Sequence, residues 1–199
     1  MTTSEGLEGP KAQGSTLTHP AAKSLWEQPS FLVTVAICAR MIAKRLGFGN
    51  QDDIFLAGLV HDIGIILEDQ FAHHHFCKIL RSLDESRTLV ENELDHLSFD
   101  HTVLGERMAE RWHFPKIAQA AIRYHHSSMS YDECDKLPVR CVELANVLCS
   151  HAGITSVGTN LVRAVDPAAM ALSLTRDDMP SLLQELQNEL VVHATLFQV

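Results

Sequence analysis

The sequence lacks the motifs that mark several common classes of enzyme and membrane protein. It has no phosphate-binding P-loop, no G-x-G-x-x-G and no G-x-S-x-G, so nucleotide-binding α/β folds and α/β-type serine hydrolases have no support. No apolar run reaches the length of a membrane span, and the N-terminal segment has neither the basic stretch nor the apolar core of a signal peptide. We therefore expect a cytoplasmic protein that makes no contact with a membrane.

Positive charge and paired cysteines are also scarce. Lys and Arg number 16 against 25 Asp and Glu, a net charge of −9, and no basic patch occurs. Binding to nucleic acid needs a basic surface that displaces counterions, so we expect none. The five cysteines are odd in number and show no C-x-x-C spacing, which argues against a disulfide framework and against a structural zinc site. We expect them to be reduced and mostly buried.

Helical periodicity dominates the chain, and no segment alternates as a β-strand would. Residues 1–25, which are polar and rich in Gly, Ser and Thr, are expected to be a flexible leader. Residues 26–199 are expected to form one all-α domain, a bundle of about seven or eight helices. The expected helices cover residues 31–47, 51–67, 70–84, 98–112, 115–126, 137–153 and 180–197, with glycine stops at 47 and 153. The charged segment 84–95 is expected to be an exposed connection, from which Glu91 or Glu93 could still reach the interior.

Histidine is the unusual residue, with 12 in the chain. His61 and Asp62 stand side by side in the apolar run FLAGLVHDIGIIL, where polar groups are costly unless something satisfies them. Helical spacing also points His101 and His125 inward, with His126 beside His125 at a helix end. Each histidine taken alone could simply bond the backbone in the core. Taken together they suggest a metal site, because bundle cores gather ligands from several helices.

The joint pattern resembles the HD superfamily of metal-dependent phosphohydrolases, and more closely its HDOD branch, the HD-related output domains of bacterial signalling proteins. The resemblance runs from residue 26 to the C-terminus. It rests on FLAGLVHDIG, on DHTVLGERMAERWHFPKIAQAAIRYHH and on VELANVLCSHAG. It implies an HD-domain-like helix bundle and a divalent transition metal, iron, manganese or zinc. The ligands that it implies are His61, Asp62, His101, His125 and His126.

The chain departs from the catalytic pattern of that superfamily at three positions. Phe31 stands where the resemblance implies a first histidine ligand, and Ile65 stands where a lysine often follows the HD-I-G run. Asn146 replaces an aspartate and offers only a neutral amide oxygen, a weak ligand. The first of the two metal positions therefore loses two partners. The second, formed by Asp62 with His101 and His125 or His126, keeps two histidines and a carboxylate, a set that suits iron or zinc.

These departures favour a signalling module over an enzyme. We expect an HDOD-type regulatory domain with a degenerate metal site, or with a metal-free hydrogen-bonded cluster, that acts through contacts with other signalling proteins or domains. The alternative is a metal-dependent phosphohydrolase, a cyclic-dinucleotide or nucleotide phosphodiesterase, in which Asp62 would bind or bridge the metal. A third reading is a helical scaffold without a ligand. HDOD domains usually carry a helical lobe before the position of residue 26, and the polar leader stands there instead. The surface that this lobe normally covers is then expected to be exposed, and we therefore also expect self-association into a homo-oligomer.

Overall fold

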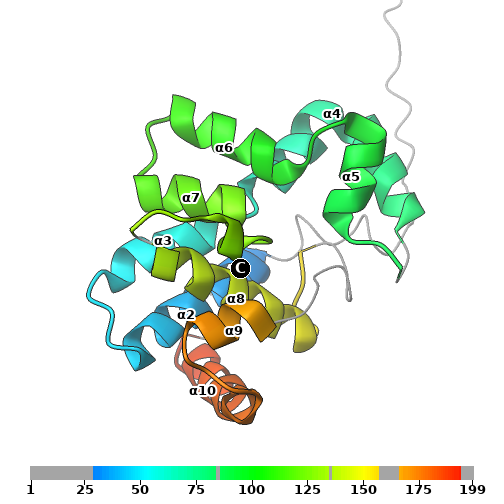
Figure 1. Ribbon diagram of the computed structural model, residues 1–199. Helices are drawn as coiled ribbons and strands as arrows, with labels where there is room; N and C mark the ends of the chain where they lie inside the picture. Colours follow the sequence, from blue (N-terminus) through cyan, green and yellow to red (C-terminus); the bar gives the residue numbers. More distant parts are fainter. Residues whose placement is uncertain (1–28, 84–85, 135, 157–165, 194–199) are drawn as a thin grey trace, which may run out of the picture.

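The computed structural model describes residues 29–83, 86–134, 136–156 and 166–193 (Figure 1). Every regular element in these ranges is a helix, which confirms the all-α prediction. The expected leader at residues 1–25 lies outside them. The α-helices are α2 (Pro29–Arg45), α3 (Gln51–Val60), α4 (Ile63–Ser82), α5 (Leu89–Leu97), α6 (His101–Arg111), α7 (Lys116–Tyr124), α8 (Lys136–His151), α9 (Asp166–Ala171) and α10 (Met179–Val192), with short 3-10 turns η2 (Ser128–Ser130) and η3 (Arg176–Asp178).

Local sequence accounts for where several helices begin and end. After α2 and α8 the chain turns through Gly47 and Gly153, both at positive φ (76° and 79°), a conformation that glycine adopts at little cost. The predicted glycine stops are thus confirmed. Asp100 caps α6 by accepting the backbone N–H groups of Thr102 and Val103, at 2.9 and 3.1 Å, which satisfies two amides that have no partner within the helix.

Two expectations about the middle of the chain are wrong. Residues 51–67 do not form one helix, because the chain breaks at His61 and Asp62 between α3 and α4. Asp62 leaves helical geometry at φ −96° and ψ 18°, and α4 then runs on through the helix expected at 70–84, with a non-helical residue at Ala72. Segment 84–95 is no mere connection, since it contains most of α5. The spacing of apolar residues does not reveal a two-residue break in a helix, nor a helix whose buried face is partly acidic.

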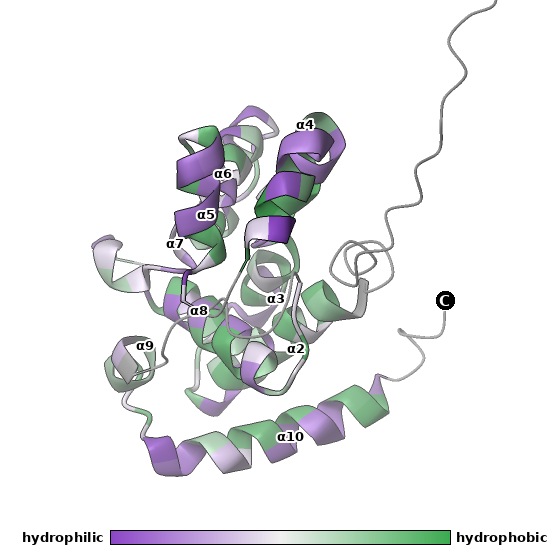
Figure 2. Cartoon of the chain, turned by 90° about the vertical axis from the view of Figure 1, so that its right-hand side faces the viewer, coloured by the Kyte–Doolittle hydropathy of each residue, from purple (hydrophilic) through white to green (hydrophobic). Residues whose placement is uncertain are grey.

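The apolar core falls into two clusters with the polar site between them. The larger cluster joins α2, α3 and α8, and α10 packs against it along α2. The smaller cluster lies between α4 and α5, around Ile65, Phe76 and Ile79. Figure 1 shows α4, α5 and α6 at one end of the molecule, and Figure 2 shows α10 lying across the opposite end. The α3–α4 corner, the start of α6 and the end of α7 meet between these two regions.

None of the helices in the described ranges is long and apolar enough to cross a lipid bilayer.

Candidate metal centre

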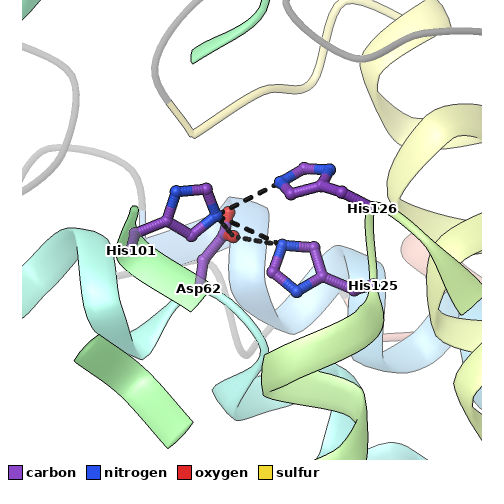
Figure 3. Close-up of side chains that lie close together, drawn as sticks. All are labelled: Asp62, His101, His125 and His126. Atoms are coloured by element: carbon purple, nitrogen blue, oxygen red, sulfur yellow. Dashed lines mark hydrogen bonds and ion pairs between the residues drawn. The ribbon is translucent and has the colours of Figure 1, made fainter. Parts of the chain in front are cut away.

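Four side chains converge in the interior, those of Asp62, His101, His125 and His126 (Figure 3). One ligand atom from each lies within 4.8 Å of all the others. His101 Nε2 is 3.4 Å from His125 Nε2 and 3.1 Å from His126 Nε2. Asp62 Oδ1 is 3.1 Å from His125 Nε2 and 3.7 Å from His101 Nε2. Three imidazole nitrogens and a carboxylate thus share one small volume that a single cation could fill.

The helix breaks and two glycines bring these groups together. Asp62 lies at the corner between α3 and α4, and His101 is the first residue of α6. A Cβ atom on Gly64 would lie 1.8 Å from the His101 carbonyl oxygen, and one on Gly105 would lie 2.7 Å from the Ile122 side chain. Only residues without a side chain permit this close packing of α4, α6 and α7. The glycines in HDIG and in HTVLG therefore set the distance between the aspartate and the histidines.

The imidazole rings of His61 and His125 are oriented by backbone carbonyl groups. His61 Nδ1–H donates to the Gly58 carbonyl oxygen at 2.7 Å, and His125 Nδ1–H donates to the Ile122 carbonyl oxygen at 3.0 Å. With Nδ1 engaged as a donor, the Nε2 lone pair of each ring points toward Asp62. Metal-bound histidines are oriented in this way, because their second nitrogen donates to a carbonyl or carboxylate.

His101 is oriented by Glu93, a residue of α5. His101 Nδ1 lies 2.7 and 2.9 Å from the two Glu93 carboxylate oxygens, and the His101 backbone N–H donates to one of them at 3.0 Å. Glu93 is fully buried. The prediction that segment 84–95 is an exposed connection is therefore wrong. The prediction that Glu93 could reach the interior from this segment is confirmed. The signal for a helix was present, because Thr88 and Glu91 form a capping box that starts α5.

Burial and charge set the protonation of the cluster. Burial alone would raise the pKa of Asp62, but the neighbouring His61 and His125 outweigh it and hold that pKa well below its ordinary value. Burial alone would lower the pKa of His101, but Glu93, then Asp62, raise it to about 9. Burial and the adjacent imidazoles lower the pKa of His126 well below its ordinary value. Without a bound metal, the cluster therefore holds one positive charge, on His101, among neutral and anionic groups.

The donor set fits a divalent transition metal. His61 Nε2 and Asp62 Oδ1 are buried atoms without a hydrogen bond in the described residues, although Asp62 Oδ1 lies close to two histidines. Such orphaned acceptors are costly in an apolar interior unless a cation satisfies them. Three imidazoles and one carboxylate match the ligand preferences of zinc, iron and manganese sites. Asp62, His101, His125 and His126 are the residues that would hold the ion.

The fifth predicted ligand, His61, lies at the edge of this group. Its Nε2 is 3.3 Å from Asp62 Oδ2, and its ring packs edge-on against the His125 ring, with ring centroids 4.9 Å apart. The Phe31 ring lies against it, with ring centroids 5.8 Å apart. Asn146 is buried on α8, and its contribution as a weak ligand stays a prediction. Sequence reasoning missed Glu68, a buried acid on α4.

A pocket of about 260 Å³ adjoins the cluster, and His125 and His126 form part of its wall. Its other walls come from the starts of α5 and α6, from α7 and from α8. The polar side chains in its lining include both signs of charge: Thr88, Asp100, Thr102, Arg123, Ser127 and Glu143. Arg123 is already engaged there, because it donates to Thr102 Oγ1 at 2.8 Å and pairs with Glu106 at 3.3 Å. The cluster therefore adjoins a small cavity through His125 and His126.

Comparisons with known proteins agree on the fold. A sequence model of the HDOD domain family matches residues 10–128. No curated protein sequence matches the chain. Three similar crystal structures are an HDOD domain protein of unknown function from Geobacter sulfurreducens (22% identity, TM-score 0.65), a candidate signal transduction protein from Marinobacter aquaeolei (21%, 0.69) and a candidate phosphohydrolase from Shewanella amazonensis (19%, 0.63). At these identities the likeness shows the shared fold alone.

The chain is shorter than these three proteins. The alignments cover 87%, 88% and 90% of this chain, but only 60%, 39% and 62% of the Geobacter, Marinobacter and Shewanella proteins respectively. What those proteins do as whole molecules therefore does not transfer to this chain.

Proposed function

This chain belongs to the HDOD domain family, and on that premise we propose that it is a bacterial signal-transduction module. Its degenerate HD site would bind one divalent transition-metal ion. Its output would be a contact with another signalling protein or domain. The signalling assignment is supported by the similar fold of the candidate signal transduction protein from Marinobacter aquaeolei. The metal assignment is supported by geometry.

One observation carries the metal assignment. The Nε2 atoms of His101, His125 and His126 meet around the Asp62 carboxylate, while the Nδ1 atoms of His101 and His125 are engaged with a carboxylate and a carbonyl oxygen. A core that needed only apolar packing would not orient three imidazoles so that their Nε2 atoms converge. A cation at this point would satisfy all of them.

The protein's own residues would do the following work in such a site. Asp62 would supply the negative charge that neutralises part of the cation, and the three imidazoles would supply neutral nitrogen ligands. When bound, a divalent metal acts as a Lewis acid and lowers the pKa of a water ligand. Glu93 would fix the His101 ring, and the carbonyl of Ile122 would fix the His125 ring. These contacts hold the ligands before the ion arrives, as a binding or sensing site requires.

Phosphoester hydrolysis is the second candidate function, supported by the fold shared with the candidate phosphohydrolase from Shewanella amazonensis. Two features of this chain weigh against it. Phe31 is buried against His61, where it offers no ligand for a first metal. Ile65, almost fully buried, offers no positive charge for a phosphate. A two-metal mechanism clamps both the attacking and the leaving oxygen, and this set of residues favours a single ion.

The test is metal analysis of protein purified without chelators or nickel resin. We expect about one equivalent of iron, manganese or zinc per chain, and we expect Asp62→Ala and His101→Ala to lose it. His74→Ala, on the exposed surface of α4, is the matched control and should keep it. A wild-type protein that stays metal-free after incubation with each metal would refute the metal assignment. Turnover of a generic phosphodiester that disappears in Asp62→Ala would instead support the hydrolase.

A further inference from the structure

Glu68 is a buried acid that the metal ligands themselves do not explain. It lies on α4 with 1% of its surface exposed, and within the described part of the chain neither of its carboxyl oxygens takes part in a hydrogen bond with a donor. A second acid, Glu93 of α5, lies within hydrogen-bonding reach of it. An isolated buried carboxylate costs several kcal/mol or more of folding free energy, so this placement needs a compensating interaction.

The arrangement around Glu93 shows which acid is the acceptor. Both oxygens of Glu93 face the His101 Nδ1–H, and one also accepts the His101 backbone N–H. Both Glu93 oxygens are therefore acceptors on this side. Two ionised carboxylates in contact in the same apolar interior would repel each other strongly. One proton between them removes the repulsion and makes a short acid–carboxylate hydrogen bond.

We propose that Glu68 is a positioning residue of the metal centre: as a neutral carboxylic acid it donates its O–H to Glu93 and so holds Glu93 against His101. The proposal rests on the proposed metal-binding function and deepens it. Glu68, Glu93 and His101 then form a continuous chain of hydrogen bonds across α4, α5 and α6 that ends at the metal ligand atom Nε2. Buried groups that support a ligand from behind are known to affect metal affinity.

The electrostatics agree with this assignment. Burial first, and the adjacent Glu93 carboxylate second, raise the pKa of Glu68 to about 9, so it carries its proton at neutral pH. The smaller apolar cluster around Ile65 and Phe76 lies beside it on α4.

Two substitutions separate the donor role from mere packing. Glu68→Gln keeps a neutral side chain of the same shape with an N–H donor, whereas Glu68→Met keeps the volume and removes the donor. We expect Glu68→Met to weaken Zn²⁺ binding by about tenfold or more and Glu68→Gln to retain most of the affinity, both measured by calorimetry on the full chain. Thermal unfolding should show Glu68→Met folded but less stable than wild type, because Glu93 loses one donor and keeps its hydrogen bonds to His101. If Glu68→Met is not folded, Glu68→Leu takes its place.

A second measurement does not depend on the metal. In the metal-free protein, ¹H–¹⁵N spectra of the His101 imidazole should show a slowly exchanging Nδ1–H in wild type and Glu68→Gln, and faster exchange in Glu68→Met. Wild-type Zn²⁺ affinity in Glu68→Met, or an equal loss in Glu68→Gln, would overturn the inference. If the wild type binds no metal, the proposed function fails, and the exchange of the His101 proton alone decides whether Glu68 holds Glu93.

Discussion

Phe31 and His61 lie against each other in the core, with their ring centroids 5.8 Å apart and their planes inclined by 55°. Phe31 is only 2% exposed, so its ring fills space beside the HD pair. The resemblance to metal-dependent HD proteins places a histidine ligand at this position. Among the described residues, the contact therefore explains why the site gathers one set of ligands, around Asp62.

Replacing Phe31 by histidine should restore part of the first metal position. We expect Phe31→His to raise the Mn²⁺ stoichiometry above that of wild type, and the double variant with Asn146→Asp to raise it further, because a carboxylate neutralises the cation better than an amide does. Metal titration followed by elemental analysis measures this. Phe48→His adds a histidine at a half-buried position after α2 and should leave the stoichiometry unchanged. An unchanged stoichiometry in both Phe31 variants would contradict the explanation.

Gly64 should tolerate no side chain. A Cβ atom there would overlap the His101 carbonyl oxygen at 1.8 Å, and the backbone of α6 cannot move aside without displacing His101. We expect Gly64→Ala to lower the free energy of unfolding by about 3 kcal/mol or more, as measured by urea denaturation. We also expect it to abolish metal binding, as measured by metal analysis. Gly49→Ala is the control, since no atom lies within 4 Å of its added Cβ. Equal stability of the two variants would show that α4 and α6 are less tightly packed.

Glu93 should control the metal affinity without being a ligand. Glu93→Gln places an amide near the His101 N–H groups and removes half of the acceptor capacity that they use. We expect the affinity for Zn²⁺ to fall by roughly 10- to 100-fold, as is typical for groups behind a ligating histidine. Glu110→Gln, on the exposed side of α6, removes the same charge and should have no such effect. Competition titration with a zinc chelator distinguishes the two variants.

Stability should depend on pH through Glu68. Its folded-state pKa is raised to about 9 by burial and by Glu93, whereas an unfolded glutamate titrates near about 4.3. The folded state therefore keeps a proton that the unfolded state has lost. Its contribution to stability is fully present below the unfolded pKa and is lost as pH rises toward about 9, at up to about 1.4 kcal/mol per pH unit.

The comparison with Glu68→Gln isolates this effect, because glutamine does not titrate. Urea denaturation of the metal-free protein between pH 5 and pH 9 should show the wild type losing stability relative to Glu68→Gln as pH rises. The other groups that act on Glu68, namely Glu93, His101 and Asp100, are unchanged in this variant. A constant difference between the two proteins across that range would be inconsistent with a protonated Glu68.

Much of the site could be predicted from local spacing. Helical periodicity pointed His101 and His125 inward, and both are fully buried. Four of the five predicted ligands come together, while the metal that they would hold stays a prediction. The supporting shell was harder to find. Glu93 lies between Leu89 and Leu97 on one helical stripe, but a charged segment of 12 residues resembles a solvated connection when it is read by composition.

By itself the sequence determined the helical class and the glycine stops after α2 and α8, because each of these follows from residues a few positions apart, and its resemblance to the HD pattern named the candidate ligands. Only the tertiary structure decided that the chain breaks at His61 and Asp62, that Phe31 lies beside His61 and that Glu68 and Glu93 stand behind His101. Glu93 bonds His101 only because α5 folds back against α4 and α6. The environment of a buried acid depends on which helices pack around it, and no local pattern of residues contains that information.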